Sequence, residues 1–341
     1  MSLQPSGLAD RRLVFVTGKG GTGKTTVAAA LALGLAEQGH RVLLAELGRD
    51  AQAPRMLALR PPPVDSEPIR LLDGLHGIRI DPFAALEEYL QLQGWTGTWL
   101  ARGLRQRGLH DLLVGTPGWR ELITLGKLWY MSGGDSPEDP ASRAYDRIIV
   151  DAPATGHGLT LLDVPRVVQS AVRSGPLARN AGRVEAMLLD PRQTVLLPVC
   201  WPETLPVHET VELVERIEHS VGIHVDRVVV NGVATPSPVD AWPDLPEHLE
   251  RLEPMPECAP SPTAIADCVR WARDRSIAQR AALDELGERL AKPHVALPHW
   301  PDQAGPGDPP DLERLRAFSK LLLQDDEAPA PDAPRERADR A

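Results

Sequence analysis

The chain has 341 residues, of which 25% are charged and 42% hydrophobic, and its formal net charge is −10. These proportions are typical of a globular protein and allow one large α/β domain or two small ones. The acidic balance argues against nucleic acid as the main partner, because phosphate backbones require clustered Lys and Arg.

Short apolar runs alternate with helical patterns along most of the chain. The runs are rich in Val, Ile or Leu and are bounded by polar or turn residues, as buried strands are. They lie at 12–17, 41–46, 146–151, 194–200, 226–232 and 294–298. Continuous apolar strands separated by helices predict an α/β fold with a doubly wound, mostly parallel sheet.

Most segments between these strands have helical patterns. Residues 26–39 are rich in Ala and Leu and end in glycine, which predicts a helix. Residues 54–70 form a Pro-rich connector. Only helical patterns occur at 83–131, which predicts a helical insertion between the second and third strands. Residues 259–291 predict one or two further helices.

Two tails frame the predicted domain. Residues 1–11 are polar, and residues 325–341 consist of Pro, Ala and charged residues with almost nothing to bury. We expect both tails to be disordered. A single domain is therefore expected over residues 12–324.

A glycine-rich motif follows the first predicted strand. The sequence GKGGTGKT at 18–25 fits G-x-x-x-x-G-K-[ST] and precedes a predicted helix, as a phosphate-binding loop does. Its glycines let successive N–H groups turn toward one anion, and the helix N-terminus adds positive charge. We expect Lys24 to reach the β- and γ-phosphates and the Thr25 hydroxyl to bind Mg²⁺. The expected nucleotide-binding residues are Gly18, Gly20, Gly21, Thr22, Gly23, Lys24, Thr25 and Thr26.

The motif carries a second lysine, Lys19, directly after its first glycine. A side chain at that place points away from the loop's own phosphates unless the backbone rearranges. Its charge would be useful across a dimer interface, where it would neutralise the partner's nucleotide in the transition state, as an arginine finger does. The alternative is a solvated surface lysine.

The loop K-G-G-T-G-K-T-T resembles the deviant phosphate loop of the MinD/ParA/nitrogenase-iron-protein/ArsA superfamily. Three further segments narrow the resemblance to the ArsA family, which includes the arsenite-pump ATPase and the ATPase that targets tail-anchored membrane proteins. They are DAPATGHGLTLLDVP at 151–165, similar to switch II, VLLPVCWPETLPVHETVELVERI at 195–217, and Asn231 at the end of VVVN. The matches run from about residue 12 to 300.

The resemblance implies a P-loop NTPase that hydrolyses Mg·ATP as a dimer opening and closing over two nucleotides. Asp151, at the end of a strand beside the loop, is expected to hold Mg²⁺ or its waters. His157 either senses the switch state or caps the following helix. Asn231 either pairs with the adenine edge or forms a turn. Glu203 and Glu209 are expected to support the interface or the start of a helix.

The sequence departs from the family at switch I. The family supplies an aspartate there, usually in D-P-A-H, which positions the attacking water. This chain reads AELGRDAQAP at 45–54, with Gly48 at the expected place. Glu46 or Asp50 would have to substitute, at about 3 Å from the water. The candidate catalytic residues are therefore Lys19, Lys24, Glu46, Asp50 and Asp151, and the candidate metal ligands are Thr25 and Asp151.

The cysteines also depart from the family. Targeting ATPases bridge their dimer with zinc through C-x-x-C, whereas this chain has Cys268-Val-Arg-Trp271, so that S₄ site cannot form. Cys200 lies in a predicted strand and is expected to be a small buried hydrophobe. With Cys258, the three cysteines do not resemble an arsenite site.

The insertion at 83–131 leaves the existence of a client site open. Targeting ATPases shield a membrane helix with Met-rich helices, but here Met131 is the only Met and residues 101–108 are basic. The tryptophans of the insertion belong either to the hydrophobic core or to a client groove. They are Trp95, Trp99, Trp119 and Trp129. The composition of the insertion also fits a short lid or a docking face for a partner ATPase.

Three functions follow from these observations. The first is an active ATPase that handles membrane-protein or other hydrophobic clients, as a homodimer or as a heterodimer with an ArsA-like paralogue. The second is a weakly hydrolysing regulatory partner of such a paralogue, because switch I lacks its aspartate. The third is a ParA/MinD-type positioning protein. It would require a basic DNA-binding face or an amphipathic membrane-targeting helix, and the sequence offers neither.

No apolar run reaches the roughly 18–20 residues of a transmembrane helix, and the first residues lack the apolar stretch of a secretion signal. The three cysteines are too few for a disulfide framework and indicate a reducing compartment. We expect the cytoplasm, with peripheral association at the inner face of the membrane left open.

Overall fold

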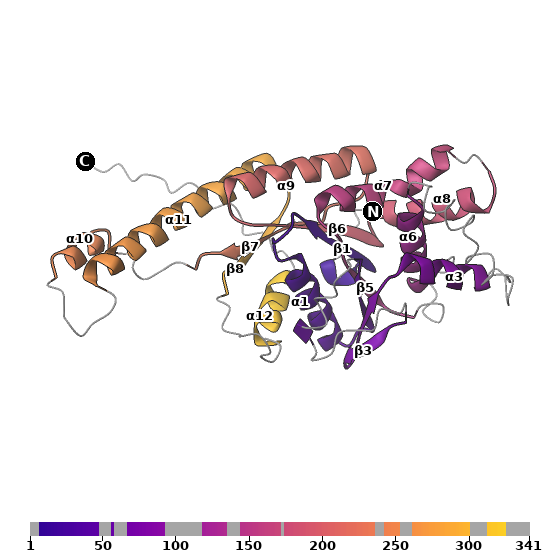
Figure 1. The fold of residues 1–341 in the computed structure, drawn as a ribbon, viewed down its shortest axis with the longest axis horizontal. Coiled ribbons are helices and arrows are strands. Elements are labelled where there is room, and N and C mark those ends of the chain that lie inside the picture. The colour runs from indigo at the N-terminus through magenta and orange to yellow at the C-terminus, as the bar shows by residue number, and fades with distance from the viewer. Residues whose placement is uncertain are drawn as a thin grey trace, which may run out of the picture.

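The computed structural model describes residues 7–47, 56–57, 67–92, 118–134, 144–171, 174–235, 242–252, 261–300 and 312–324. Within these ranges, eight strands form one sheet in the order β3-β4-β2-β5-β1-β6-β7-β8 (Figure 1). The strands are β1 (Leu13–Gly18), β2 (Val42–Glu46), β3 (Ile69–Leu72), β4 (Leu75–Arg79), β5 (Arg147–Asp151), β6 (Thr194–Cys200), β7 (Val228–Val233) and β8 (His294–Pro298). Every neighbouring pair is parallel except β3 and β4, which confirms the predicted α/β fold.

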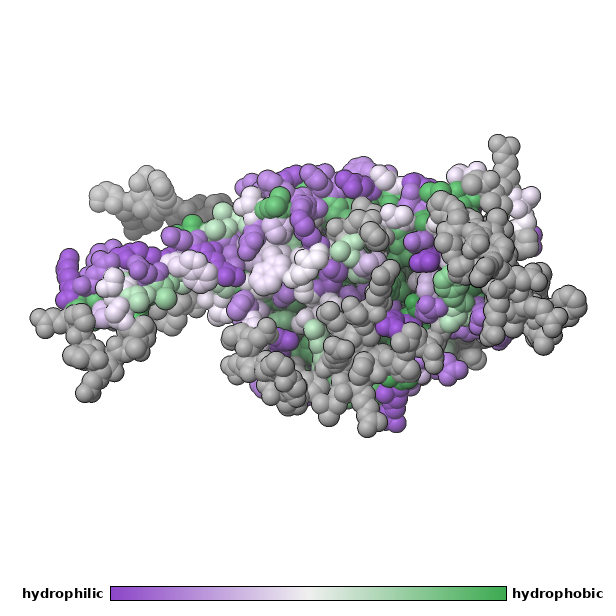
Figure 2. Space-filling view, viewed as in Figure 1, coloured by the Kyte–Doolittle hydropathy of each residue, from purple (hydrophilic) through white to green (hydrophobic). Residues whose placement is uncertain are grey.

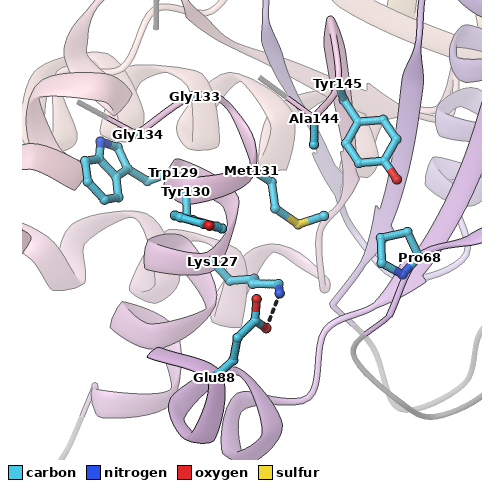
Figure 3. Close-up of a pocket in the computed structure, with 10 residues that line it drawn as sticks. All are labelled: Pro68, Glu88, Lys127, Trp129, Tyr130, Met131, Gly133, Gly134, Ala144 and Tyr145. Atoms are coloured by element: carbon cyan, nitrogen blue, oxygen red, sulfur yellow. Dashed lines mark hydrogen bonds and ion pairs between the residues drawn. The ribbon is translucent and has the colours of Figure 1, made fainter. Parts of the chain in front are cut away.

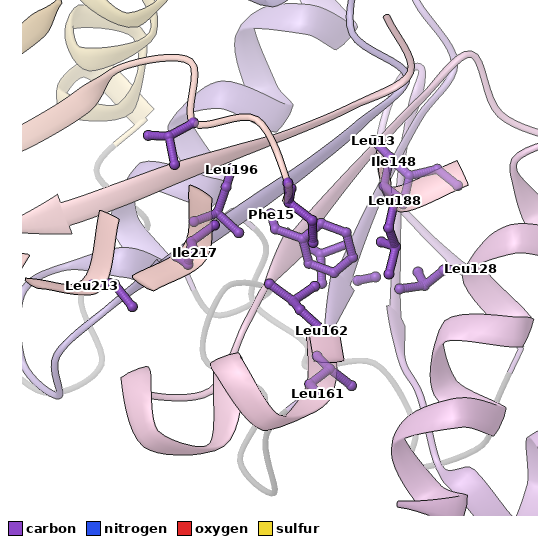
Figure 4. Packing of buried hydrophobic residues seen from close by; sticks show 14 of the residues in the cluster. Leu13, Phe15, Leu128, Ile148, Leu161, Leu162, Leu188, Leu196, Leu213 and Ile217 are labelled. Atoms are coloured by element: carbon purple, nitrogen blue, oxygen red, sulfur yellow. The ribbon is translucent and has the colours of Figure 1, made fainter. Parts of the chain in front are cut away.

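Apolar side chains cover both faces of the sheet because successive residues of a buried strand point to opposite sides. In β1, Leu13 and Phe15 join one apolar cluster, whereas Val14 and Val16 join the other. Figure 4 shows Phe15 in the first cluster, among leucines and isoleucines of the neighbouring strands and helices. The sheet is therefore enclosed on two sides, as the continuous apolar strands predicted.

The helices divide between these two faces. On the face of Val14 lie α1 (Lys24–Glu37) and α12 (Leu312–Leu322). On the face of Phe15 lie α3 (Pro82–Leu92), α6 (Trp119–Met131), α7 (Thr155–Ala171), α8 (Pro176–Leu189) and α9 (Thr204–Arg216). Helix α1 is buried from Val27 to Leu35, and the chain leaves it through Gly39 at φ +92°. A helix this deeply packed fixes the loop that precedes it.

A long helix projects from the body of the molecule. Helix α11 (Pro262–Arg289) has 28 residues, and the short helix α10 (Leu245–Glu250) packs at its far end (Figure 1). Its inner end is anchored against α9, where Ala282 and Leu286 are buried. Figure 2 shows hydrophilic residues along one edge of the projecting part and pale to hydrophobic residues beside them, and Ile265, Trp271 and Ile277 are exposed on this helix. The helical pattern at 259–291 thus forms one helix.

A two-stranded hairpin at the sheet edge was not predicted. Strands β3 and β4 are antiparallel and are joined through Asp73 and Gly74, the latter at φ +70°. An Asp-Gly pair between apolar residues is a hairpin signal, but the strands are short and β4 includes His76 and Gly77. The connector expected at 54–70 consequently ends before Ile69, and the helical region follows β4 instead of β2.

The N-terminal segment also differs from expectation. Residues Leu8–Asp10 form a 3₁₀ turn, and Leu8 is buried in the cluster that contains α1. Ordered structure therefore begins before residue 12, because one leucine in a polar stretch is enough to anchor a turn. The C-terminal tail expected at 325–341 lies outside the described residues.

The expected insertion at 83–131 is helical where it is described, at α3 and α6, and residues 93–117 lie outside the described ranges with Trp95 and Trp99. Trp119 and Met131 are buried in α6, 8% and 6% exposed, so these two side chains belong to the core. Among the described helices, none is long and apolar enough to cross a membrane.

Candidate nucleotide-binding site

The glycine-rich loop lies at the carboxyl edge of the parallel sheet. Strand β1 runs between β5 and β6 and ends at Gly18, and α1 begins at Lys24. In the register of the sheet, Val16 pairs with Asp151 and Gly18 pairs with Val199. The fold thereby brings Asp151 beside the loop, as the sequence predicted from their strands.

Gly23 closes the loop in a conformation that a side chain would disturb. Its φ is +90°, in the left-handed region, and a Cβ added there would lie 2.2 Å from Nδ2 of Asn231. Only glycine meets both conditions without strain. Gly21, at φ +83°, shares the left-handed conformation.

Thr25 and Asp151 meet directly. The Thr25 hydroxyl donates to Oδ2 of Asp151 over 2.7 Å. Burial raises the pKa of Asp151, and both this hydrogen bond and the charge of Lys24 oppose the increase. A hydroxyl and a carboxylate in contact are the hard oxygen ligands that Mg²⁺ prefers, so these two residues fit the expected metal.

Lys24 lies inside the loop, where it contacts the main chain. Its Nζ donates to the carbonyl oxygen of Lys19 over 2.9 Å, and the Thr22 hydroxyl donates to the same oxygen over 3.0 Å. Burial lowers the pKa of Lys24, whereas the nearby charge of Asp151 raises it. One carbonyl thus accepts the donors that a phosphate oxygen would receive in a loaded loop.

Two side chains from the next strands hold the outer side of the loop. Asn231, in β7, donates from Nδ2 to the carbonyl of Thr22 over 2.9 Å. Trp201, directly after β6, donates from Nε1 to the carbonyl of Gly21 over 2.9 Å. Trp201 also covers Gly232, since a Cβ there would lie 2.4 Å from the indole ring. No role was expected for Trp201, although it lies in the segment 195–217 that resembles the ArsA family.

Lys19 forms an ion pair within the same chain. Its Nζ meets the carboxylate of Glu209 on α9, and the two side chains are 53% and 36% exposed. The other carboxylate oxygen of Glu209 is buried and has no hydrogen-bond partner among the described residues. Lys19 therefore points away from its own loop, as expected, and its partner Glu209 is a residue that was expected to support the interface or the start of a helix.

The switch residues are only partly described. Glu46 ends β2, pairs in register with Asp151 on β5 and is 3% exposed, so it lies close to the contact between Thr25 and Asp151. Gly48 and Asp50 fall outside the described residues, as does the side chain of His157 within α7. Thr26 faces Met56, with 3.9 Å between Oγ1 and Sδ.

The two described cysteines, Cys200 and Cys268, take no part in a metal site, and Cys258 lies outside the described ranges. Cys200 is buried in β6, as predicted, and burial raises the pKa of its thiol to about 12. Cys268 is exposed on α11. Within the described ranges, no group of three or more His, Cys, Asp or Glu residues is arranged to bind a metal ion.

Comparison with known proteins places these features in a family. The model of the anion-transporting ATPase family matches residues 11–180 and 177–245. ATPase BagA of Mycobacterium tuberculosis strain H37Rv is 35% identical over 255 residues, covering 72% of this chain and 69% of that protein. ATPase GET3 of Chaetomium globosum is 27% identical over 270 residues, 67% of this chain and 74% of that one. A putative arsenical pump-driving ATPase of Prosthecochloris vibrioformis is 31% identical over 157 residues, 45% and 36% of the two chains.

Proposed function

Because this chain belongs to the anion-transporting ATPase family, we propose that it binds Mg·ATP at the glycine-rich loop and hydrolyses it as a two-subunit switch. The family is one of nucleotide-binding ATPases. The observation that carries the proposal is the 2.7 Å contact between Thr25 and Asp151, with Lys24 beside them. A loop, a lysine, a hydroxyl and a carboxylate at the ends of adjacent strands are the groups that phosphoryl transfer requires.

Each of these residues has a distinct role in the proposal. Lys24 leaves the carbonyl of Lys19 and binds the terminal phosphates. Thr25 and Asp151 hold Mg²⁺, which supplies charge neutralisation to the transferred phosphoryl group. Glu46 is the candidate for positioning the attacking water, since its strand neighbours that of Asp151. Asp50 remains the alternative for that role.

We further propose that two subunits close face to face, with Lys19 of each reaching the other's nucleotide. The half-exposed position of Lys19 supports this, because its side chain is directed to α9 and not to its own loop. The partner is a second copy or an ArsA-like paralogue. A hydrophobic or membrane-protein client, which the resemblance to the ArsA family implies, completes this proposal.

A second function is a regulatory subunit that binds ATP and hydrolyses it weakly. It is favoured by Gly48, which stands where the family has the water-positioning aspartate. In both functions the nucleotide site belongs to one domain, proposed for residues 12–324 with the turn Leu8–Asp10 packed against it, and the proposed location is the cytoplasm.

Steady-state ATPase activity distinguishes these two functions. It is measured for the purified chain alone and together with any ArsA-like paralogue encoded by a neighbouring gene. Turnover that requires Lys24 supports the active ATPase. Tight Mg·ATP binding with turnover only in the presence of the paralogue supports the regulatory subunit. A chain that does not bind Mg·ATP under either condition contradicts both.

A further inference from the structure

A cavity lies between the helices α3 and α6 and the segment that leads into β5. It has a volume of about 570 Å³, within the range of small-molecule sites. Figure 3 shows Lys127 and Glu88 pointing toward each other inside it, with Met131 and Tyr145 directed into the same space. The described residues that line this cavity include none of the phosphate-binding residues and neither Glu46 nor Asp151.

The charged pair in this cavity is asymmetric. Lys127, on α6, forms an ion pair with Glu88 on α3. The side chain of Lys127 is 9% exposed, whereas that of Glu88 is 39% exposed. Glu88 can therefore turn into water at little cost, but Lys127 cannot leave without breaking the packing of α6. A ligand anion that breaks this ion pair would therefore replace Glu88 and bind to Lys127, which stays in place.

The rest of the cavity is suited to an apolar body. Among the described lining residues, Lys127 and Glu88 are the charged ones, and the others include three aromatic residues, Trp129, Tyr130 and Tyr145. Arg183 lies over Trp129, with its Cζ 5.8 Å from the ring centroid, and is a further cation beside one of the lining residues. A buried cation next to aromatic walls favours a ligand with one negative group and a flat or chain-like apolar part.

We propose that this cavity binds a small amphipathic monoanion, a carboxylate or sulfonate on an aromatic or aliphatic body, whose charged group replaces Glu88 on Lys127. The proposal does not depend on nucleotide binding. A membrane-spanning helix does not fit the same cavity, because it would bury the lysine against hydrocarbon without an anion. The competing explanation is that the ion pair only ties α3 to α6.

Two fluorescent probes with the same body test the proposal. The anion 8-anilinonaphthalene-1-sulfonate and the neutral N-phenyl-1-naphthylamine differ by the sulfonate group. We expect Lys127→Met to weaken binding of the sulfonate by about tenfold or more, since a hydrogen bond to a charged group is lost, and to leave the neutral probe within about twofold. Glu88→Gln should tighten sulfonate binding several-fold, because the lysine loses its competing carboxylate.

Matched variants exclude general effects of charge. Lys320→Met and Glu87→Gln make the same chemical changes at exposed positions of α12 and α3 and should leave both probes unaffected. Circular dichroism shows whether Lys127→Met unfolds the chain. If it does, the proposal is still tested by Glu88→Gln, which is expected to increase the affinity for the sulfonate. Sulfonate affinity that Glu88→Gln leaves unchanged or lowers, in a folded protein, overturns the proposal.

Discussion

Lys24 and Lys19 are joined through the main chain, because Nζ of Lys24 donates to the carbonyl oxygen of Lys19 over 2.9 Å. The ammonium of Lys19 itself is held by Glu209. A phosphate in the loop competes with that carbonyl for Lys24, so we expect nucleotide binding to release the Lys19 carbonyl and allow its peptide to turn. Since this turn moves the Lys19 side chain as well, we expect nucleotide binding to loosen its pair with Glu209.

Lys24→Ala should strongly weaken the binding of Mg·ATP to the loop. Hydrogen bonds to charged groups contribute about 1.5–3 kcal/mol each, and the phosphates also lose the cation nearest to Asp151, so we expect Mg·ATP binding to weaken by about 100-fold or more. Isothermal titration calorimetry of the parent and the variant measures this. Equal affinities would show that the loop is not the nucleotide site.

Lys19→Ala and Glu209→Gln should act in opposite directions. The first removes the charge proposed to cross the interface, so ATP should still bind but should no longer drive association. The second releases Lys19, so association with a non-hydrolysable ATP analogue should strengthen by up to about fivefold, since exposed ion pairs contribute about 0.2–1 kcal/mol. Sedimentation velocity measures both effects.

The matched control for this pair is Glu212→Gln, which neutralises an exposed carboxylate on the same helix, α9. It should leave association unchanged. A Lys19→Ala protein that associates with the ATP analogue as strongly as the parent would contradict a role for this lysine across the interface.

Asp151→Asn should stabilise the nucleotide-free chain while removing its response to Mg·ATP. Burial raises the folded-state pKa of Asp151, so this group contributes stability below its unfolded pKa that is lost as the pH rises through the folded value. At neutral pH the buried charge is therefore a cost that asparagine relieves. We expect the melting temperature of the Asp151→Asn protein to exceed that of the parent by about 2–4 °C, which corresponds to roughly 1 kcal/mol of unfolding free energy in a domain of this size.

The same raised pKa sets the pH dependence of metal binding. As the pH falls, Asp151 takes up a proton at a higher pH than an ordinary aspartate, so the melting-temperature increase caused by Mg·ATP should shrink early in an acid titration. Asp284→Asn, at an exposed position on α11, should change neither measurement. An Asp151→Asn protein that is still stabilised by Mg·ATP would exclude this residue from the metal site.

The central strands and the loop were predictable because their signals are local. Buried parallel strands are continuous apolar runs, and the order strand, glycine-rich loop, helix occurs within residues 12–39. The hairpin at the sheet edge was not predicted, because β3 and β4 are short and only partly apolar. Their Asp73–Gly74 turn was the available signal.

The contacts that hold the loop were not predictable, because they join residues far apart in sequence. Trp201 reaches Gly21 across 180 positions, and Glu209 reaches Lys19 across 190. Each depends on which strands neighbour β1 in the sheet, a property of topology that no local pattern carries. Cys200 was predictable for the opposite reason, since burial within a strand follows from the strand itself.

Trp201→Phe and Asn231→Ala should each weaken nucleotide binding by about fivefold. Each removes one neutral hydrogen bond to a loop carbonyl, which contributes about 1 kcal/mol, while phenylalanine still covers Gly232. The loop carbonyls then turn more freely, and the N–H groups are less well directed at the phosphates. Trp242→Phe, at an exposed position beside α10, is the control and should have no effect.

Tripolyphosphate distinguishes support of the loop from recognition of adenine. If Asn231 acts by holding the carbonyl of Thr22, its replacement by alanine weakens Mg·ATP and Mg·tripolyphosphate by the same factor, because both occupy the loop. If Asn231 instead pairs with the adenine edge, only ATP loses affinity. The 2.9 Å contact with Thr22 predicts equal losses, and calorimetry with the two ligands on parent and variant measures them. A loss confined to ATP would assign Asn231 to the base and leave Trp201 as the residue that holds the outer side of the loop.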